Sequence, residues 1–202
     1  FNKNYTCVAV SKTKPTEDIL KIYNLGHKDF GENKVQELEI KHSILPKDIN
    51  WHMIGHLQTN KVKKIVPFIS LIHSVDSIKL LKVINKESKK INKITKCLIQ
   101  VNISNEVSKS GCHPEELLDL AKLVKSMENV NLKGIMALPK LTNDKNERDI
   151  MMQSVKELSL KLQSFYPEAG YISLGTTSDF KEAIINGANM VRIGESIFGK
   201  RL

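Results

Sequence analysis

The lysine at position 12 follows a predicted strand and is the residue of this chain best placed for covalent chemistry. Residues 5–10 ahead of it form a short β-branched run typical of a buried strand, and Pro15 and Thr16 behind it begin a helical pattern. In an α/β barrel, such strand-to-helix turns gather at the mouth where catalytic and cofactor-binding groups collect. Most of the 31 Lys and Arg residues should be solvated surface charges. Lys12 is the exception that we expect to hold an aldehyde.

Glycine and hydroxyl residues follow the last two predicted strands. Gly175 and Thr177 come after the seventh strand, and Gly194 and Ser196 come at the end of the eighth. Barrels often bind a phosphate group at these two loops, through backbone N–H groups and the dipole of a short helix. Hydroxyl residues before a helix also serve as N-caps, so these loops alone are weak evidence for a phosphate site.

Other polar residues near predicted strand ends have a structural interpretation beside the functional one. Arg192 lies inside an apolar strand next to a glycine, where a guanidinium requires an anionic or acceptor partner. Asn33 is equally consistent with ligand binding and with a turn or cap. His56 and His73 are expected to be loop or packing histidines. Glu32 is expected to be a charge at a helix start, where the helix dipole favours it.

Eight short apolar runs predict eight β-strands. They span residues 5–10, 28–31, 51–54, 70–74, 96–103, 131–138, 171–175 and 189–193. Amphipathic stretches fill most of the intervals, most clearly from Met151 to Phe165. This alternation requires parallel strands with right-handed crossovers, so we expect an α/β fold, a single (β/α)8 TIM barrel over residues 1–202. The alternative is an open doubly wound sheet, which a GxGxxG fingerprint would have favoured; the sequence contains none.

The net charge of +9 raises nucleic-acid binding as a remote alternative. We expect no nucleic-acid partner, because the lysines are scattered and the aromatic content of 5% offers few stacking platforms. The cysteines at 7, 97 and 112 show neither a CxxC pair nor a zinc-ligand spacing, which indicates a reducing compartment and no metal site. We find no run of about 18 apolar residues and no signal-peptide core, so we expect a cytoplasmic protein without a membrane partner.

Five segments resemble the pyridoxal 5′-phosphate (PLP) homeostasis protein family, single-domain relatives of the barrel domain of alanine racemase. These segments are residues 8–15, 30–37, 51–58, 173–175 and 191–199. The resemblance implies PLP as the cofactor, with Lys12 as the Schiff-base lysine and Arg192 facing the pyridine nitrogen. It also places Thr177 at a usual serine position of the phosphate loop. The full candidate set for cofactor binding is Lys12, Asn33, Ser173, Gly175, Thr177, Arg192, Gly194 and Glu195.

The chain departs from the family pattern in three places. The phosphate loop reads Gly-Thr-Thr-Ser at 175–178 where Gly-Met-Ser is usual, which leaves open whether Thr176, Thr177 or Ser178 binds the phosphate. Lys34 stands where tyrosine is common. A helix that normally precedes the first strand is missing, so the chain is a fragment or its uncovered apolar surface finds a partner. We therefore expect a monomer of low stability or weak self-association.

Two functions follow from the resemblance. One is a non-catalytic carrier that holds PLP and supplies it to apo-enzymes; the alternative is a PLP-dependent amino-acid racemase. A nearby cation such as Lys14 or Arg192 favours the unprotonated Lys12 amine that a Schiff base needs, and Lys14 is the fallback attachment site. Alanine racemases use a second base from an additional β domain. This chain has no length for that domain, so the carrier is favoured and no catalytic residue is assigned.

Overall fold

The computed structural model describes residues 5–104, 110–140 and 142–199. Eight parallel strands close into a barrel in the order of the sequence, with β1 paired to both β2 and β8. The strands are β1 (Thr6–Val10), β2 (Asp29–Glu32), β3 (Asn50–Met53), β4 (Leu71–Val75), β5 (Thr95–Val101), β6 (Val130–Ala137), β7 (Tyr171–Thr176) and β8 (Met190–Ile193). The predicted TIM barrel is confirmed, and the open doubly wound sheet is wrong.

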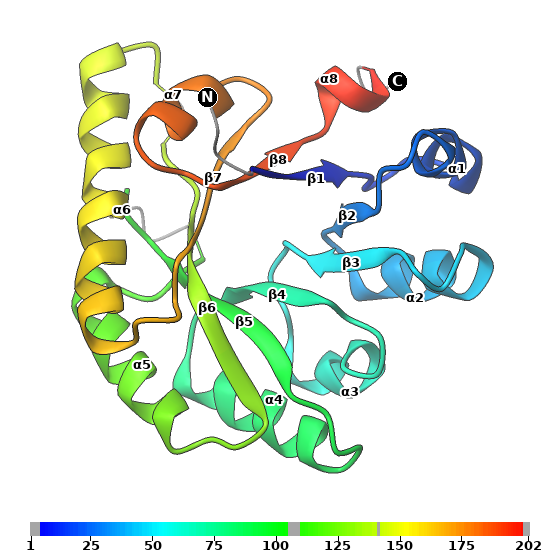
Figure 1. The fold of residues 1–202 in the computed structure, drawn as a ribbon, viewed down its shortest axis with the longest axis horizontal. Coiled ribbons are helices and arrows are strands. Elements are labelled where there is room, and N and C mark those ends of the chain that lie inside the picture. The colour runs from blue at the N-terminus through cyan, green and yellow to red at the C-terminus, as the bar shows by residue number, and fades with distance from the viewer. Residues whose placement is uncertain (1–4, 105–109, 141, 200–202) are drawn as a thin grey trace.

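Helices lie around the outside of this barrel (Figure 1). They are α1 (Thr16–Asn24), α2 (Val35–Ile44), α3 (Val62–Ile65), α4 (Ile78–Lys89), α5 (Leu117–Lys125), α6 (Lys145–Phe165), α7 (Phe180–Ile185) and α8 (Glu195–Phe198), with 3₁₀ turns η1 (Thr59–Lys61) and η2 (Pro114–Glu116). Polar caps fix two of the starts: the Ser77 hydroxyl accepts from the N–H of Leu80, and Asp144 accepts two N–H groups at the start of α6.

Alternation along the strands divides the core into two parts. Outward-facing strand residues such as Ala9 and Ile72 pack against the helices. Inward-facing apolar residues form a separate cluster inside the barrel: Val8, Leu71, Leu98, Met136 and Met190. Two positions further along three of these strands, the same inward face carries polar residues instead: His73, Gln100 and Arg192. On these three strands, the polar residues therefore lie above apolar ones, towards the carboxyl ends of the strands.

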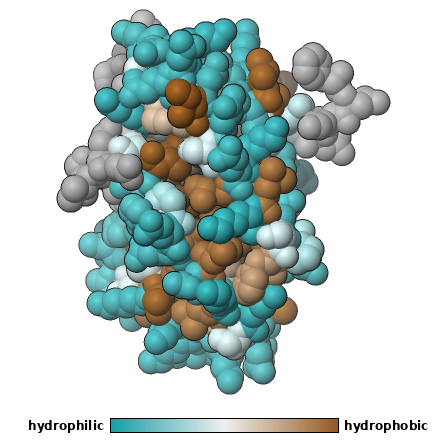
Figure 2. Space-filling view, turned by 90° about the vertical axis from the view of Figure 1, so that its left-hand side faces the viewer, coloured by the Kyte–Doolittle hydropathy of each residue, from teal (hydrophilic) through white to brown (hydrophobic). Residues whose placement is uncertain are grey.

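The outer surface mixes polar side chains with exposed apolar ones. Figure 2 shows apolar residues among polar ones on the face that carries α6, and Ile150 and Leu160 of this helix are largely exposed. None of the helices in the described ranges combines the length and apolar character needed to cross a membrane. Within the same ranges, His, Cys, Asp and Glu side chains form no group of three or more that could hold a metal ion.

Candidate functional site

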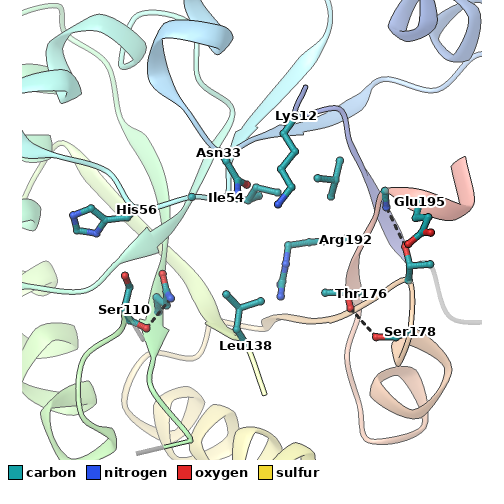
Figure 3. Close-up of a pocket in the computed structure, with 15 residues that line it drawn as sticks. Lys12, Asn33, Ile54, His56, Ser110, Leu138, Thr176, Ser178, Arg192 and Glu195 are labelled. Carbon is teal, nitrogen blue, oxygen red and sulfur yellow. Dashed lines mark hydrogen bonds between the residues drawn. The ribbon is translucent and has the colours of Figure 1, made fainter. Parts of the chain in front are cut away.

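A cavity of about 710 Å³ lies at the carboxyl ends of the strands, a size usual for cofactor sites (Figure 3). Its lining residues are Val10, Lys12, Asn33, Ile54, Gly55, His56, Gln100, Ser110, Leu138, Thr176, Thr177, Ser178, Arg192, Gly194 and Glu195. Six of the eight residues predicted to bind a cofactor are among them, all except Ser173 and Gly175. Residues far apart in sequence therefore meet where the barrel topology predicts.

Lys12 and Arg192 both extend into this cavity (Figure 3). Lys12 follows the end of β1 by two residues, so its side chain takes the same inward direction as Val10, which also lines the cavity. Lys14, the fallback attachment site, is not part of the lining. Its ammonium nitrogen donates instead to the carbonyl oxygen of Phe198 at 2.9 Å, which ties the β1–α1 loop to α8.

A buried ionic cluster holds the backbone on both sides of Lys12. The ammonium nitrogen of Lys41 donates to the Ser11 carbonyl oxygen at 2.7 Å, to Glu32 at 2.8 Å and to Glu37 at 2.6 Å. Ser11 also donates its hydroxyl to Glu32 at 2.6 Å. Glu37 accepts the N–H of Thr13 at 2.6 Å. The residues directly before and after Lys12 are thus connected through one buried cation.

The prediction that Glu32 is a charge at a helix start is wrong. Glu32 is the last residue of β2 and is fully buried, with Lys41 and Ser11 as partners. Burial raises the pKa of its carboxyl group, although the hydrogen bond and the charge of Lys41 oppose that effect. Thr13 has φ of 65°, a left-handed conformation unfavourable for a β-branched residue, and its N–H bond to Glu37 helps to hold it there.

The loops after β7 and β8 meet on the other side of the cavity. The backbone N–H of Gly194 donates to the Thr177 hydroxyl at 3.3 Å. The Thr176 hydroxyl is already engaged, because it and the Thr176 N–H donate to Asp179 at 2.9 and 2.7 Å, and it also lies 3.3 Å from the Ser178 hydroxyl. Gly175 allows the backbone of this loop a conformation that other residues rarely adopt, with φ of 92°. A Cβ atom there would lie 2.6 Å from the Cβ of Ala183.

Arg192 is anchored from behind by groups outside the cavity lining. Its Nη1 donates to the Ser173 hydroxyl at 2.5 Å, and its Nη2 donates to the Ala137 carbonyl oxygen at 3.0 Å. Ser173 is therefore placed below Arg192, one layer deeper in the barrel. Burial lowers the pKa of Arg192 to about 10, with the charge of Asp179 acting in the opposite direction. The guanidinium stays cationic at neutral pH.

Several lining residues were not in the predicted set. Gln100 donates to the Ser110 carbonyl oxygen at 2.8 Å, which closes one wall. His56, expected to be a loop or packing histidine, lies at the rim with its side chain 57% exposed and 3.3 Å from Asp76. The inward position of Gln100, two residues after Leu98, was a signal that alternation alone could have revealed. The loop contacts of Ser110 and His56 have no such local signal.

Together, these groups form a consistent set of donors. An amine on one side can react with a carbonyl carbon, hydroxyl and N–H groups on the other can bind an oxyanion, and a buried cation between them can face a polar ring atom. Lys12, Thr177 and Arg192 are the cavity residues that carry groups of these three kinds. The set fits PLP, which has an aldehyde, a phosphate group and a pyridine nitrogen.

Comparison with known proteins agrees with this geometry. The sequence model of the family described as alanine racemase, N-terminal domain, matches residues 2–201. A pyridoxal phosphate homeostasis protein of Pasteurella multocida (strain Pm70) is 40% identical over 199 residues, covering 96% of this chain and 85% of that protein. The solved structure of PipY from Synechococcus elongatus PCC7942 without PLP has a TM-score of 0.92 and 30% identity, over 97% of this chain and 93% of PipY.

PipY has also been solved with PLP bound, and that structure matches with a TM-score of 0.89 and 29% identity, over 98% of this chain and 94% of PipY. Both the family model and the 40% identical relative extend over nearly the whole sequence, barrel and cavity loops included. The chain therefore belongs to the alanine racemase N-terminal domain family and, within it, to the pyridoxal phosphate homeostasis proteins.

Proposed function

We propose that this protein binds PLP in the 710 Å³ cavity, holds it as a Schiff base on Lys12 and supplies it to apo-enzymes without catalytic turnover. The observation that carries the proposal is the meeting of Lys12, Arg192 and the Thr177–Gly194 contact in one cavity. The names of the relatives support a role in PLP homeostasis, and PipY supports binding of PLP by this kind of barrel.

Lys12 supplies the amine. When PLP is bound, its aldehyde condenses with a lysine amine and releases water. Lys41 supports this step indirectly, because it holds the Ser11 carbonyl oxygen and, through Glu37, the Thr13 N–H. An amine on a fixed backbone loses less conformational freedom when it reacts, so its attachment is more favourable.

Thr177, Gly194 and the neighbouring N–H of Glu195 are proposed to bind the phosphate group. Thr177 is favoured over Thr176 because the Thr176 hydroxyl already bonds to Asp179. Ser178, which also lines the cavity, is the second hydroxyl within this loop. Asn33 is proposed to contact the ring region from the wall opposite, at the carboxyl end of β2.

Arg192 is proposed to face the pyridine nitrogen. Its guanidinium has five N–H donors, so the bonds to Ser173 and Ala137 leave others for a ligand. A permanent cation beside the nitrogen keeps that nitrogen unprotonated, which makes the ring a poor sink for carbanion charge. This is why we propose retention of the cofactor and not turnover of amino acids.

Absorption spectroscopy tests the proposal. The purified protein incubated with PLP should show a visible band that borohydride removes, and Lys12→Ala should lack this band. Lys34→Met is the matched control, because Lys34 is exposed beside the cavity and should leave the band intact. A band of equal strength in Lys12→Ala contradicts the assignment. Delivery to apo-enzymes, the cytoplasmic location and weak self-association stay predictions.

A further inference from the structure

A continuous chain of hydrogen bonds leads from the cavity into the barrel interior. Arg192 Nη1 lies 2.5 Å from the Ser173 hydroxyl, which lies 2.9 Å from His73 Nδ1. His73 Nε2 lies 2.9 Å from His52 Nδ1, and His52 Nε2 lies 3.0 Å from Asp29 Oδ1. The path passes from β8 through β7, β4 and β3 to β2.

This chain connects the two ends of the barrel. Ser173 and His73 are fully buried, and Arg192 and His52 are 4% exposed. The Asp29 side chain is 31% exposed. Asp29 and His52 both line a smaller cavity of about 200 Å³ at the amino ends of the strands. Its lining residues are Thr6, Asp29, Asn50, His52, Ser70, Leu71, Lys96, Tyr171 and Met190.

The chemistry of the end groups gives the chain one direction. Arginine can only donate, so the Ser173 hydroxyl accepts from Arg192. Because the Asp29 carboxylate at the other end can only accept, two neutral histidines must both donate through Nε2, and Ser173 then gives its own proton to His73 Nδ1. His73 then carries its proton on Nε2 and donates to His52 Nδ1. His52 carries its proton on Nε2 and donates to the Asp29 carboxylate, which can only accept. With both histidines neutral, a single arrangement satisfies all four bonds.

The electrostatics of the chain agree with this arrangement. Burial lowers the pKa of His73 well below its usual value, and the charge of Arg192 acts in the same direction. Burial alone would raise the pKa of Asp29, but the hydrogen bonds that it accepts from His52 and Asn50 act in the opposite direction, and that pKa is lowered overall. His73 is therefore neutral and Asp29 ionised near neutral pH, as the bond directions require.

Polar residues are unusual at these positions, because barrel interiors are usually filled by branched apolar side chains. A buried polar group costs stability unless each of its bonds is made, and here each link is made by the next residue. We propose that Ser173, His73 and His52 are positioning residues for Arg192, coupling its guanidinium to Asp29 at the opposite mouth. The proposal rests on the proposed function, in which Arg192 faces the PLP ring.

The first test needs no cofactor. Long-range ¹H–¹⁵N NMR of the histidine side chains should find both His73 and His52 neutral and protonated on Nε2 at neutral pH. A proton on Nδ1 of either residue overturns the directed chain. His56, exposed at the cavity rim, serves as the reference for a histidine outside the chain.

The second test compares variants that keep or break the chain. His73→Leu removes both links, whereas His73→Gln keeps an acceptor and a donor in the same direction. His73→Leu should weaken PLP retention about fivefold, the usual effect of losing one buried hydrogen bond, and should shift the pH midpoint of the bound absorption band. His73→Gln should stay close to wild type. Ser88→Ala is the control, because Ser88 is equally buried and its hydroxyl pairs with the Thr95 hydroxyl, outside the hydrogen-bond chain of Arg192.

Asp29→Ala breaks the hydrogen-bond chain at its partly exposed end, where a substitution disturbs folding less. It should shift the same pH midpoint in the same direction by a smaller amount, and an unchanged midpoint overturns the coupling to the opposite mouth. If His73→Leu matches Ser88→Ala in retention and spectrum, the positioning role is wrong while the proposed function stands. If the wild-type protein retains no PLP, the proposed function itself falls.

Discussion

The ammonium nitrogen of Lys41 lies 2.7 Å from the carbonyl oxygen of Ser11, the residue directly before Lys12. Lys41 is the cation between two carboxylates, Glu32 and Glu37, and its side chain is only 6% exposed. Because Glu37 also holds the Thr13 N–H, the position of the Lys12 backbone depends on an ion cluster whose side chains are not part of the cavity lining. Stability and the proposed attachment of PLP to Lys12 are therefore linked at this loop.

Replacing Lys41 by Met should lower the free energy of unfolding by about 3–5 kcal/mol, the usual effect of leaving a buried charge without its partner. Urea unfolding measures this change. Lys64→Met is the control, because Lys64 pairs with Glu39 at the surface and its loss should change stability by about 1 kcal/mol or less. Equal losses in the two variants contradict the structural role of Lys41.

The fully buried His73 should make stability depend on pH. Its pKa is lowered in the folded protein from the ordinary value of 6.5, so only the unfolded chain gains a proton as the pH falls below that value. The stabilisation is present above about pH 6.5 and is lost towards the lower folded pKa, by at most about 1.4 kcal/mol per pH unit for one proton.

His73→Gln should therefore flatten the fall in unfolding free energy between about pH 6.5 and pH 5, measured by urea unfolding at several pH values. His56→Gln is the control, since it makes the same substitution at an exposed histidine. Parallel curves for wild type and His73→Gln are the result that contradicts this expectation.

Thr177→Ala should weaken PLP retention by about 1 kcal/mol or more, the usual effect of losing a charge-assisted hydrogen bond to the phosphate group. Equilibrium dialysis of the variant measures the change. Ser178→Ala is the comparison, because this second hydroxyl also lines the cavity. A larger loss for Ser178→Ala than for Thr177→Ala moves the phosphate contact to Ser178.

The bound cofactor should be chemically quiet. In the proposed function, Arg192 faces the pyridine nitrogen and disfavours carbanion formation. Deuterium exchange at Cα of alanine should therefore be far slower than about 1 per second, the low end of ordinary enzymes. NMR follows the exchange, and Lys12→Ala sets the background. Exchange at or above that rate that depends on Lys12 favours the racemase alternative.

The sequence predicts the barrel well because strand and helix periods are local signals. The sequence places Lys12 at the barrel mouth because a strand that ends at Val10 puts the following residues in the strand-to-helix loop. Arg192 was identified for the same reason, as a cation within an apolar strand. Both follow from alternation and from the rule that barrel sites lie after the strands.

Contacts between distant elements were not predictable in this way. The sequence around Glu32 resembles a helix start, so its burial has no local signal. Its partners Ser11 and Lys41 come from other elements. The place of Ser173 below Arg192 depends on the register between β7 and β8, which no local pattern specifies. The hydrogen bonds of His52 to His73 and Asp29 likewise form only when the strands close into a barrel.

Attachment of PLP to Lys12 is tested most directly by peptide mass spectrometry after borohydride reduction of the protein with PLP. We expect one reduced adduct, on Lys12, at a stoichiometry that follows the visible band. Lys14, whose ammonium group bonds to the Phe198 carbonyl oxygen, and the exposed Lys34 should remain unlabelled. An adduct found only on Lys14 or Lys34, with Lys12 unmodified, would contradict the account.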